Sequence, residues 1–586
     1  QRNLYLSGMF AEVEMRTPPP DSMAHVAQQR DSATAVVALS DSVRRDTAAR
    51  DSVKRDTVAR SSVRRDTVTR VTMRSDSLNN RAARRDSTNG EVTDLRSFAT
   101  DSARRARRLR RLVADTAKIV RLRVTEAQLH RLDLTGGFST ADFAQFEAAL
   151  TRYNLWGAGR RVTLRGTLAN IGAPQLSGSG PFYDVANGTE GSTRNAFLSP
   201  IWATSLDFTQ PWFLSPRNQL GASLFAHRRT IPGIAIDRGK GATIALTREH
   251  GPRVSTTLGY TYEASTVDAS DVYFCVTFGV CVRSSISAVS RGNAIAPIAL
   301  ATIIDQSDNA LSPSNGYRAR IELEHASAYT LSDFRYNRIA LTGTRYIRMS
   351  ARNVLAGRIR LGWVNALGTT ADALNVTGAS GEEVIHPRKR FFAGGSQSVR
   401  GFGENQLGPR VLTVAPEKFT KAPNDTTPAL CTVQQLRNLT CDPNSARLSA
   451  SDFAPQPLGG TSIAEGSIEF RFPLRFYTGL SGALFVDGAL IGTDRFSSIL
   501  GATGAVTPGF GFRLSTPVGP VRLDLGVRPT LSERLPVITQ VADSLGNATL
   551  VTLKTTRQYS PVDASGNILR QILGRLTLHL SVGPAF

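Results

Sequence analysis

The sequence predicts an all-β protein, a 16-stranded antiparallel transmembrane β-barrel over residues 129–586. Three observations support this fold class. Stretches of 8–14 residues alternate apolar and polar side chains. The connections between these stretches are alternately short and long. The chain ends on an aromatic residue within such a stretch. Together they are the signature of a barrel whose outer face meets lipid and whose inner face lines a polar lumen.

The alternation is clearest between residues 521 and 528. Apolar side chains take one face and charged side chains the other, namely Val521, Leu523, Leu525 and Val527 against Arg522, Asp524 and Arg528. The stretches 317–324 and 355–363 repeat the pattern. A soluble sandwich would turn the charged face to water, whereas a membrane barrel turns it to a wet lumen. For a barrel we expect Leu523→Arg near the midplane to cost about 2–4 kcal/mol and Asp524→Arg to cost less.

The connections distinguish the two architectures, because outer-membrane barrels have short turns on one side and long loops on the other. Short turns are expected at Asn154–Arg160, Leu214–Asn218, Arg248–Arg253, Met349–Asn353, Phe472–Thr478 and Ser515–Pro520, with a somewhat longer one at Asp305–Asn315. The long loops are expected at 171–198, 267–292, 366–460 and 529–572. An even strand number returns the C-terminus to the side of the N-terminus, which places the long loops at the cell surface.

Hydropathy and charge exclude two other classes. No run of 18 apolar residues occurs, so a helical membrane span is not expected. The net charge of +22 suggests nucleic acid, but the arginines lie in an N-terminal repeat and on alternate strand positions, with no zinc finger or RNA-binding motif. We therefore expect no nucleic-acid partner.

The four cysteines form two local pairs, Cys275 with Cys281 and Cys431 with Cys441, both in loop-like sequence. Local, even pairing suits disulfides in an oxidising compartment. The alternatives are free thiols or a metal site. Scattered histidines and the lack of a C-x-x-C motif speak against zinc, and we expect no metal.

The first 128 residues have another composition. Residues 1–16 and 117–128 suggest a helix end and two matching strands of a small α/β domain, interrupted by a low-complexity insertion at 17–116. The insertion repeats every five residues from Asp41 to Arg70, a period that aligns its valines on neither a helix nor a strand face. We expect it to be disordered or a solvated helix. Gln1 follows no visible leader, so we expect an exported product whose signal lies outside this sequence.

Several motifs identify a family. They are FFAGGSQSVRGF at Phe391–Phe402, GP at Gly408–Pro409, GSIEF at Gly466–Phe470, FVDG at Phe485–Gly488 and TPVGPVRLDLG at Thr516–Gly526. With these motifs the chain resembles the BamA/TamA-type assembly barrels of the bacterial surface antigen family. The stretch Gln1–Phe10 looks like the last helix of a POTRA domain of that family, which would make residues 1–16 and 117–128 a partial last POTRA domain.

Arg400 is the candidate loop anchor, within the motif Val399, Arg400, Gly401 and Phe402. Glu469 and Asp487 lie on the polar faces of two expected strands and would point into the lumen. If the long loop 366–460 folds inward, Arg400 can lie between them, and an Arg–carboxylate pair of this kind is directional. The family resemblance implies this anchoring; the residues alone leave open that Arg400 is a solvated loop charge.

The first and last strands are expected to form a weak seam. The first, near residues 131–138, ends in Gly136 and Gly137, and the last contains Gly583 and Pro584 before the terminal Phe586. Proline cannot donate a ladder hydrogen bond, and a weak seam could offer an edge to an incoming strand. The Gly-rich stretch at Gly401–Gly408 lacks the ending of a phosphate-binding loop, and no hydrolase motif occurs, so we expect neither cofactor nor enzymatic activity.

The sequence therefore predicts an outer-membrane protein assembly factor, with its N-terminal part in the periplasm. The resemblance implies unfolded outer-membrane proteins as clients, contact with outer-membrane lipid, and periplasmic accessory lipoproteins and chaperones. Two alternatives remain open at this point: a two-partner-type polypeptide exporter, and a passive porin or surface adhesin.

Overall fold

The computed structural model of the chain describes residues 10–16, 69–71, 120–126, 128–177, 197–281, 286, 290, 292–309, 312–368, 370–374, 384–421, 428–474, 479–493, 503–516, 519–542, 548–560 and 568–582. They fall into two units, Gln1–Leu129 and His130–Phe586, which are described separately. Among the described helices, none is long and apolar enough to span a membrane.

The first unit contains a three-stranded sheet of order β1-β3-β2. Its strands are β1 (Phe10–Arg16), β2 (Thr69–Val71) and β3 (Val120–Glu126), and β3 pairs antiparallel with both neighbours. The β1–β3 pair joins the two strands expected on either side of the insertion. The insertion was expected to be disordered or a solvated helix. This expectation is wrong for Thr69–Val71, which form the strand β2. The rest of the insertion and the stretch 1–9 lie outside the described residues, and the partial POTRA domain stays a prediction.

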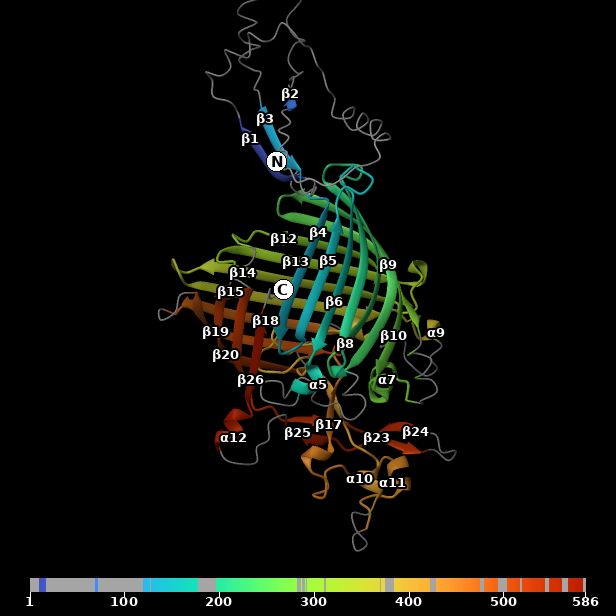
Figure 1. The fold of residues 1–586 in the computed structure, drawn as a ribbon. Helices are drawn as coiled ribbons and strands as arrows, with labels where there is room; N and C mark the ends of the chain where they lie inside the picture. The colour runs from blue at the N-terminus through green and yellow to red at the C-terminus, as the bar shows by residue number, and fades with distance from the viewer. Residues whose placement is uncertain are drawn as a thin grey trace, which may run out of the picture. The chain divides into compact units, whose positions relative to one another are not determined.

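The second unit is a closed antiparallel barrel (Figure 1). Its strands are β4 (His130–Ser139), β5 (Phe143–Arg152), β6 (Arg161–Ile171), β7 (Ile201–Pro211), β8 (Asn218–Ile231), β9 (Ala235–Gly251), β10 (Val254–Ala269), β11 (Asn293–Ile295), β12 (Ile298–Asp305), β13 (Gly316–Ala326), β14 (Tyr336–Arg348), β15 (Val354–Ala366), β18 (Ser462–Pro473), β19 (Leu480–Gly492), β20 (Thr503–Thr516), β21 (Gly519–Val527) and β26 (Leu576–Val582). β11 and β12 both pair with β10, on either side of Ala296 and Pro297, and so form one interrupted strand. Counted in this way the barrel has 16 strands, as predicted.

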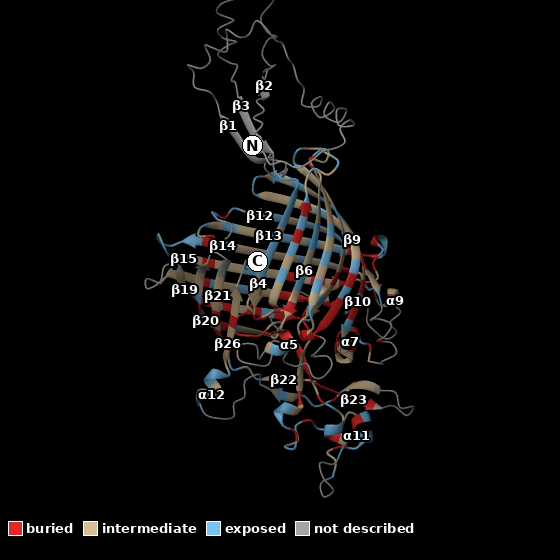
Figure 2. Ribbon diagram, in the orientation of Figure 1, coloured by how far each residue is buried: buried red, intermediate tan, exposed pale blue. Residues whose placement is uncertain are grey.

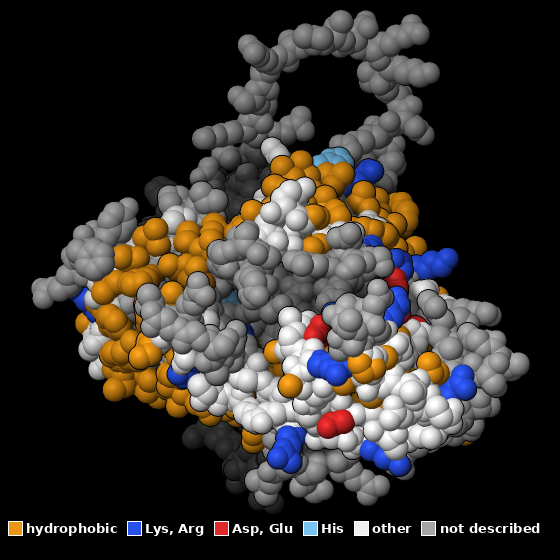
Figure 3. Space-filling view, turned by 90° about the horizontal axis from the view of Figure 1, so that it is seen from below, with side chains coloured by type: hydrophobic (Ala, Val, Ile, Leu, Met, Phe, Trp, Pro, Cys, Tyr) orange, Lys and Arg blue, Asp and Glu red, His pale blue; other side chains and the backbone are white. Residues whose placement is uncertain are grey.

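Side chains alternate between the two faces of the barrel wall. Leu132, Leu164, Leu224 and Ile359 are among the many large apolar side chains that stay exposed on the outer face. The lumenal positions beside them are mostly of intermediate burial (Figure 2). Seen from the end that carries the long loops, hydrophobic side chains gather along the flank of the barrel (Figure 3). This distribution fits a wall that faces lipid on the outside.

The long loop 366–460 has two parts. After α9 (Thr370–Ala373), residues 384–407 run inside the barrel and include η4 (Pro387–Lys389). We call residues 384–407 the inward segment. Its side chains share one hydrophobic cluster with the barrel wall, in which Phe391, Val399, Phe402 and Leu407 are fully buried. Residues 410–457 do not fold inward, which corrects the expectation of a single inward loop.

The described residues of 410–457 and 533–559, namely 410–421, 428–457, 533–542 and 548–559, together build a small domain that we call the cap. Its core contains Leu412, Phe419, Leu436, Val537 and Leu553. The cap strands form two sheets, β17-β16-β23-β24 and β22-β25. The elements are β16 (Arg410–Thr413), α10 (Glu417–Thr420), α11 (Val433–Arg437), η5 (Ala450–Asp452), β17 (Ala454–Pro457), β22 (Glu533–Leu535), β23 (Val537–Ala542), β24 (Ala548–Thr552) and β25 (Arg557–Tyr559).

The described parts of the other loops contain the short helices α5 (Ala173–Leu176), α7 (Asp271–Phe278), η3 (Ala328–Thr330) and α12 (Ile568–Leu573).

Candidate functional site

The inward segment turns sharply, and its glycines permit the turn. Gly394 has a φ of 104°, and a Cβ there would lie 2.3 Å from the carbonyl oxygen of Gly403. At Gly401 a Cβ would lie 2.3 Å from the side chain of Thr507 in β20. Glycine is therefore required at both positions for the loop to fold back and to approach the wall.

Arg400 lies at the tip of the inward segment and is only 4% exposed. Its Nε lies 2.7 Å from Oδ2 of Asp487 and its Nη2 lies 2.9 Å from Oδ1, a two-pronged contact with one carboxylate. Its Nη1 donates to Glu469 Oε2 at 2.6 Å. The guanidinium also stacks 3.4 Å from the centre of the Phe485 ring. Both carboxylates named from the sequence thus contact Arg400, through the planar donor geometry that distinguishes arginine from lysine.

Burial alone would lower the pKa of Arg400, but the hydrogen bonds and negative charge of Asp487, followed by the charge of Glu469, raise it above its ordinary value. Arg400 therefore stays charged at any physiological pH.

Further charged side chains surround Arg400 and its two carboxylate partners. Arg471 and Arg513 bind Glu469, and Arg513 and Arg522 bind Asp524, which itself lies 3.7 Å from Arg400 Nη1. Asp524 is 2% exposed, so it does not line a wet lumen as expected. Sequence reasoning placed Asp524 on the polar face but missed its role, because only the folded loop brings Arg400 to it.

The backbone at the tip of the inward segment contacts the last barrel strand. His579 Nε2 lies 3.0 Å from the carbonyl oxygen of Arg400, and Thr577 Oγ1 donates to the carbonyl oxygen of Gly401 at 3.0 Å. Arg528 Nε donates to the same Gly401 oxygen at 3.1 Å. A Cβ at Gly526 would lie 2.1 Å from the Arg400 oxygen, so Gly526 makes room for the loop. The sequence carried no signal for these contacts of β26.

The seam between β4 and β26 is short. Within the described residues, which end at Val582, the two strands pair at two positions, Ser139 with Ser581 and Phe138 with Val582, and Thr140 N donates to Leu580 O at 2.9 Å. By contrast β4 pairs with β5 at ten positions and β26 pairs with β21 at seven. The described part of β26 therefore leaves His130–Gly137 of β4 without a partner on that side.

Of the glycines expected to weaken the seam, the structure describes Gly136 and Gly137 but not Gly583. Gly136 and Gly137 lie opposite Phe146 and Gln145 in β5, and a Cβ at Gly137 would lie 3.1 Å from Val582 O. Gly137 thus lies directly beside the last strand. Gly583, Pro584 and Phe586 lie outside the described residues, and their part in the seam stays a prediction.

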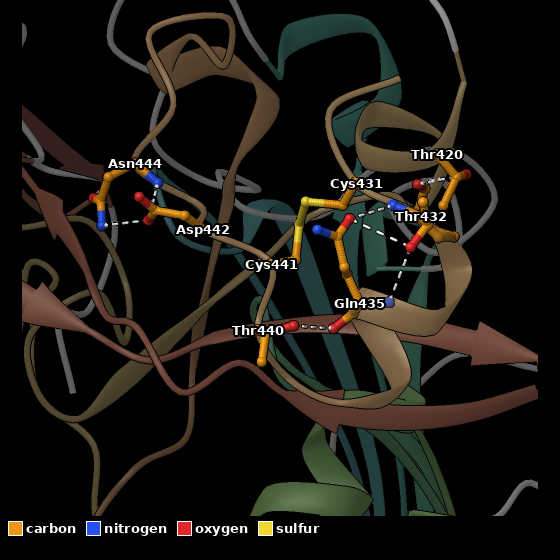
Figure 4. Close-up of a disulfide and its surroundings, with 9 residues drawn as sticks. Thr420, Cys431, Thr432, Gln435, Thr440, Cys441, Asp442 and Asn444 are labelled. Carbon is orange, nitrogen blue, oxygen red and sulfur yellow. Dashed lines mark hydrogen bonds between the residues drawn. A yellow bond between two sulfur atoms is a disulfide. The ribbon is translucent and has the colours of Figure 1, made fainter. Parts of the chain in front are cut away.

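Both expected cysteine pairs form disulfides in the structure. Cys275–Cys281 joins the second half of α7 to the residues that follow this helix in the loop after β10, and Cys431–Cys441 encloses α11 in the cap (Figure 4). Thr432 and Gln435 cap the start of α11 with reciprocal side-chain hydrogen bonds.

A second ionic cluster lies elsewhere in the lumen. One nitrogen of His227 and carboxylate oxygens of Asp237 and Glu263 lie within 4.8 Å of one another, a donor set that could hold a metal ion. However, Arg388 Nη1 lies 2.9 Å from Glu263 Oε1, 3.0 Å from Asp237 Oδ2 and 3.2 Å from His227 Nε2. A guanidinium of the chain itself thus neutralises the carboxylates. That the barrel takes no metal stays a prediction.

Comparison with known proteins places this geometry in a family. The Omp85 superfamily domain matches residues 154–534. The fold is similar to BamA from Haemophilus ducreyi lacking POTRA domains 1–3, with 15% identity over 79% of this chain and 71% of that chain, at a TM-score of 0.49.

It is also similar to CdiB from Escherichia coli, with 9% identity over 78% of this chain and 64% of that chain, at a TM-score of 0.38. For CdiB from Acinetobacter baumannii the identity is 12% over 78% of this chain and 60% of that chain, at a TM-score of 0.37. The chain thus spans less than two thirds of either CdiB structure. Because the Omp85 domain covers well over half of its length, the chain belongs to the Omp85 superfamily of outer-membrane barrels.

Proposed function

We propose that this barrel inserts and folds other β-barrel proteins in the outer membrane, and that client strands enter through the seam between β4 and β26. The observation that carries the proposal is a contrast in pairing among the described residues: the seam has two paired positions, whereas β26 and β21 have seven and β9 and β10 have sixteen. A closed barrel protects its edges by pairing, so a junction this short is the place where the barrel opens most easily.

An open seam would present the free edge of β4 to an incoming strand. Residues His130–Gly137 carry unpaired backbone groups on the side of the seam, within the described part of the chain. β-Augmentation supplies main-chain hydrogen bonds to any extended segment, which suits clients of different sequence. The clients would be unfolded outer-membrane proteins, supported by outer-membrane lipid, periplasmic accessory lipoproteins and chaperones. Neither catalysis nor a cofactor is required, and the N-terminal unit would lie in the periplasm.

Arg400 contributes to this function by fixing the inward segment against β26. With Glu469 and Asp487 holding the side chain, the carbonyl groups of Arg400 and Gly401 accept bonds from His579 and Thr577. The last strand is then held from the lumen even when the seam opens, so that opening separates β4 from β26 without unravelling the barrel.

The test is a disulfide across the seam in the full-length protein. Because Thr140 and Leu580 are hydrogen-bonded, the neighbouring pair Ser139–Ser581 is a non-hydrogen-bonded pair with Cα atoms about 4.5 Å apart, within disulfide range. The variant Ser139→Cys/Ser581→Cys, reconstituted in liposomes, should stop inserting client barrels when oxidised and resume when reduced.

The matched control is Thr247→Cys/Thr257→Cys. These threonines face each other between β9 and β10 with their Oγ1 atoms 2.8 Å apart, in strands that pair at sixteen positions. This variant undergoes the same oxidation and reduction, including any effect on the native disulfides, and should insert clients in both states. Unchanged insertion by the locked seam would reject the proposal and favour an exporter, which passes its substrate through the lumen.

A further inference from the structure

Three cations lie close together on the outer face of the barrel, where apolar side chains are the rule. Asp237 is buried in the lumen, and successive side chains of a strand point to opposite faces, so Arg238 and Lys240 of β9 point outward. Both are exposed. Arg228 of β8 lies opposite Arg238 in the strand register and therefore shares that face. We call Arg228, Arg238 and Lys240 the outer basic cluster.

The outer basic cluster lies at one edge of the apolar band. The outward residues that follow Lys240 in β9 are apolar as far as Leu246, and the next one is the exposed Arg248 near the short turn to β10. Arg238 and Arg248 are ten residues apart, which at the rise and tilt of a barrel strand corresponds to about 26 Å along the barrel axis. The apolar band of an outer-membrane barrel is about 25 Å tall, so these two arginines lie at its opposite edges.

The charges of Arg238 and Lys240 are poorly neutralised by the protein. Arg238 has one carboxylate partner in the described part of the chain, Asp268, whose Oδ2 lies 3.7 Å from Arg238 Nη1. Both side chains of this pair are about half exposed, and such pairs contribute little. Lys240 has no carboxylate within 4 Å among the described residues.

The strand register adds a repulsion to this excess of charge. Arg228 and Arg238 lie directly opposite each other on one face, and like charges in such positions destabilise a strand pair. Nη1 of Arg228 donates to the carbonyl oxygens of Ser199 and Pro200 at 3.2 and 2.8 Å, which orients the guanidinium without cancelling its charge. An anion bound between the two arginines would replace the repulsion by two attractions.

Small side chains leave Lys240 uncovered. In its row of the wall, the outward positions of the neighbouring strands are occupied by Thr204, Ala226 and Ala264. In the next row toward the short turns, three of the four outward side chains are large and exposed, namely Leu206, Leu224 and Tyr262. The cations therefore stand beside a low stretch of wall, directly next to apolar side chains.

We propose that the outer basic cluster binds a phosphorylated glycolipid of the outer leaflet, with the chemistry of the diphosphorylated glucosamine disaccharide of lipopolysaccharide. The long loops of an outer-membrane barrel face the cell exterior, which places the Arg238 end of β9 in the outer leaflet. Arginine and lysine form charge-assisted hydrogen bonds with phosphate oxygens. The low row around Lys240 leaves space for the sugar, and the acyl chains lie along Leu224 and Tyr262. A cluster of cations favours an anion with more than one phosphate. The proposal does not rest on the assembly activity.

The test is the binding of purified diphosphoryl lipid A to the full-length protein in detergent, measured by native mass spectrometry. Arg238→Gln/Lys240→Gln should bind it about tenfold more weakly than the wild type or worse, because charge-assisted hydrogen bonds to phosphate are lost. The matched control is Arg152→Gln/Arg248→Gln, which removes two exposed arginines from the outer face at the short-turn end. This control should bind like the wild type. Wild-type binding by the first variant, or equal weakening in both, would overturn the proposal.

Two further lipids test the chemistry of the ligand. Dephosphorylated lipid A has the same acyl chains without the phosphates, and phosphatidylglycerol has a single phosphate. Each should bind the wild type about tenfold more weakly than diphosphoryl lipid A or worse. Binding of either lipid as tight as that of diphosphoryl lipid A would overturn the assignment to a phosphorylated glycolipid.

Two milder variants keep the proposal testable if the neutral double variant does not fold. Lys240→Gln removes one charge and should weaken binding of diphosphoryl lipid A. Arg238→Lys/Lys240→Arg keeps both charges and should bind like the wild type. Wild-type affinity in Lys240→Gln, or loss of binding in the charge-preserving variant, would show that the cluster does not recognise the phosphates through its charge.

Discussion

At the scale of one residue, Arg400 joins three parts of the molecule: its side chain holds β18 and β19, and its backbone carbonyl contacts β26. Arg400→Ala should loosen the inward segment, at a cost of about 3–5 kcal/mol to its attachment, because Asp487 loses its buried partner. The barrel should stay folded while client insertion falls. Arg400→Lys should rescue only in part, because lysine lacks the planar fork.

Two measurements check this expectation: protease cleavage within residues 384–407 and client insertion in liposomes. Arg352→Ala is the control, because Arg352 lies exposed in the turn between β14 and β15. Wild-type protease resistance together with wild-type insertion in Arg400→Ala would mean that the anchor has no functional role.

Glu404, four residues further along, should make the inward segment sensitive to pH. Burial, reinforced by the negative charge of Asp142, raises the pKa of Glu404 from 4.5 to about 7. A carboxyl group with a raised pKa in the folded state stabilises that state fully below its unfolded pKa, and the stabilisation is lost as the pH rises through about 7. Amide protection near Ser396, whose N–H donates to Glu404 at 3.1 Å, should therefore be weaker at pH 8 than at pH 5.

Glu404→Gln is the control for this effect, because it keeps the shape of the side chain and removes the titration. After correction for intrinsic exchange rates, its protection should be the same at both pH values. If the variant keeps the pH dependence of the wild type, another group is responsible.

At the scale of one element, β21 shows what the alternation of apolar and polar residues can and cannot predict. It correctly assigned Leu523 and Leu525 to one face and Asp524 to the other. It did not show that the lumen beside Asp524 is filled, because the inward segment that fills it starts some 140 residues earlier in the chain. Asp524→Arg should therefore cost more than the alternation alone indicates, because a fourth cation would meet Arg400, Arg513 and Arg522, and whether it still costs less than Leu523→Arg stays a prediction.

Leu523→Arg should still destabilise the barrel by about 2–4 kcal/mol if it lies near the bilayer midplane, because it places a charge in lipid. Unfolding by urea from lipid vesicles measures this. Ser312→Arg, in the exposed turn between β12 and β13, should change the midpoint little. If the two substitutions have equal effects, β21 does not face lipid at this position.

The disulfide Cys431–Cys441 should stabilise the cap and leave the barrel unaffected. It closes a loop with a sequence separation of 10 residues, for which loop-closure entropy gives a stabilisation of about 3 kcal/mol. Cys431→Ser/Cys441→Ser should therefore make residues 410–457 more sensitive to protease at unchanged barrel stability. Mass mapping without reductant checks the pairing itself, and a fragment that links Cys275 or Cys281 to the cap would contradict it.

Local features of the elements were predictable and long-range ones were not. The short turns, the strand number and the cysteine pairs each follow from residues close together in the sequence. The pairing of β16 with β23 joins Leu412 to Val537, and nothing near either residue indicates its partner. The same holds for Arg388, which was one of many arginines until the fold placed it against Glu263.

At the scale of the whole barrel, pairing is uneven around the ring. β8, β9 and β10 are 14 to 17 residues long and pair along their lengths, whereas β26 has 7 residues. We expect amide hydrogen exchange to be fastest in β4 and β26 and slowest in β9 and β10, because exchange follows local opening. Equal protection around the ring would show that the barrel has no preferred opening point.

The cap is built from two loops, which restricts how the sequences of these loops can change. Its core takes Leu412 and Phe419 from one loop and Val537 and Leu553 from another, and a parallel strand pair joins the two. A graft of either loop alone from a relative would leave half of a hydrophobic core without its complement. A chimera must therefore exchange residues 410–457 and 533–559 together, and epitopes on the two loops should vary together. A substitution in the core of one loop should be found with a compensating substitution in the other loop.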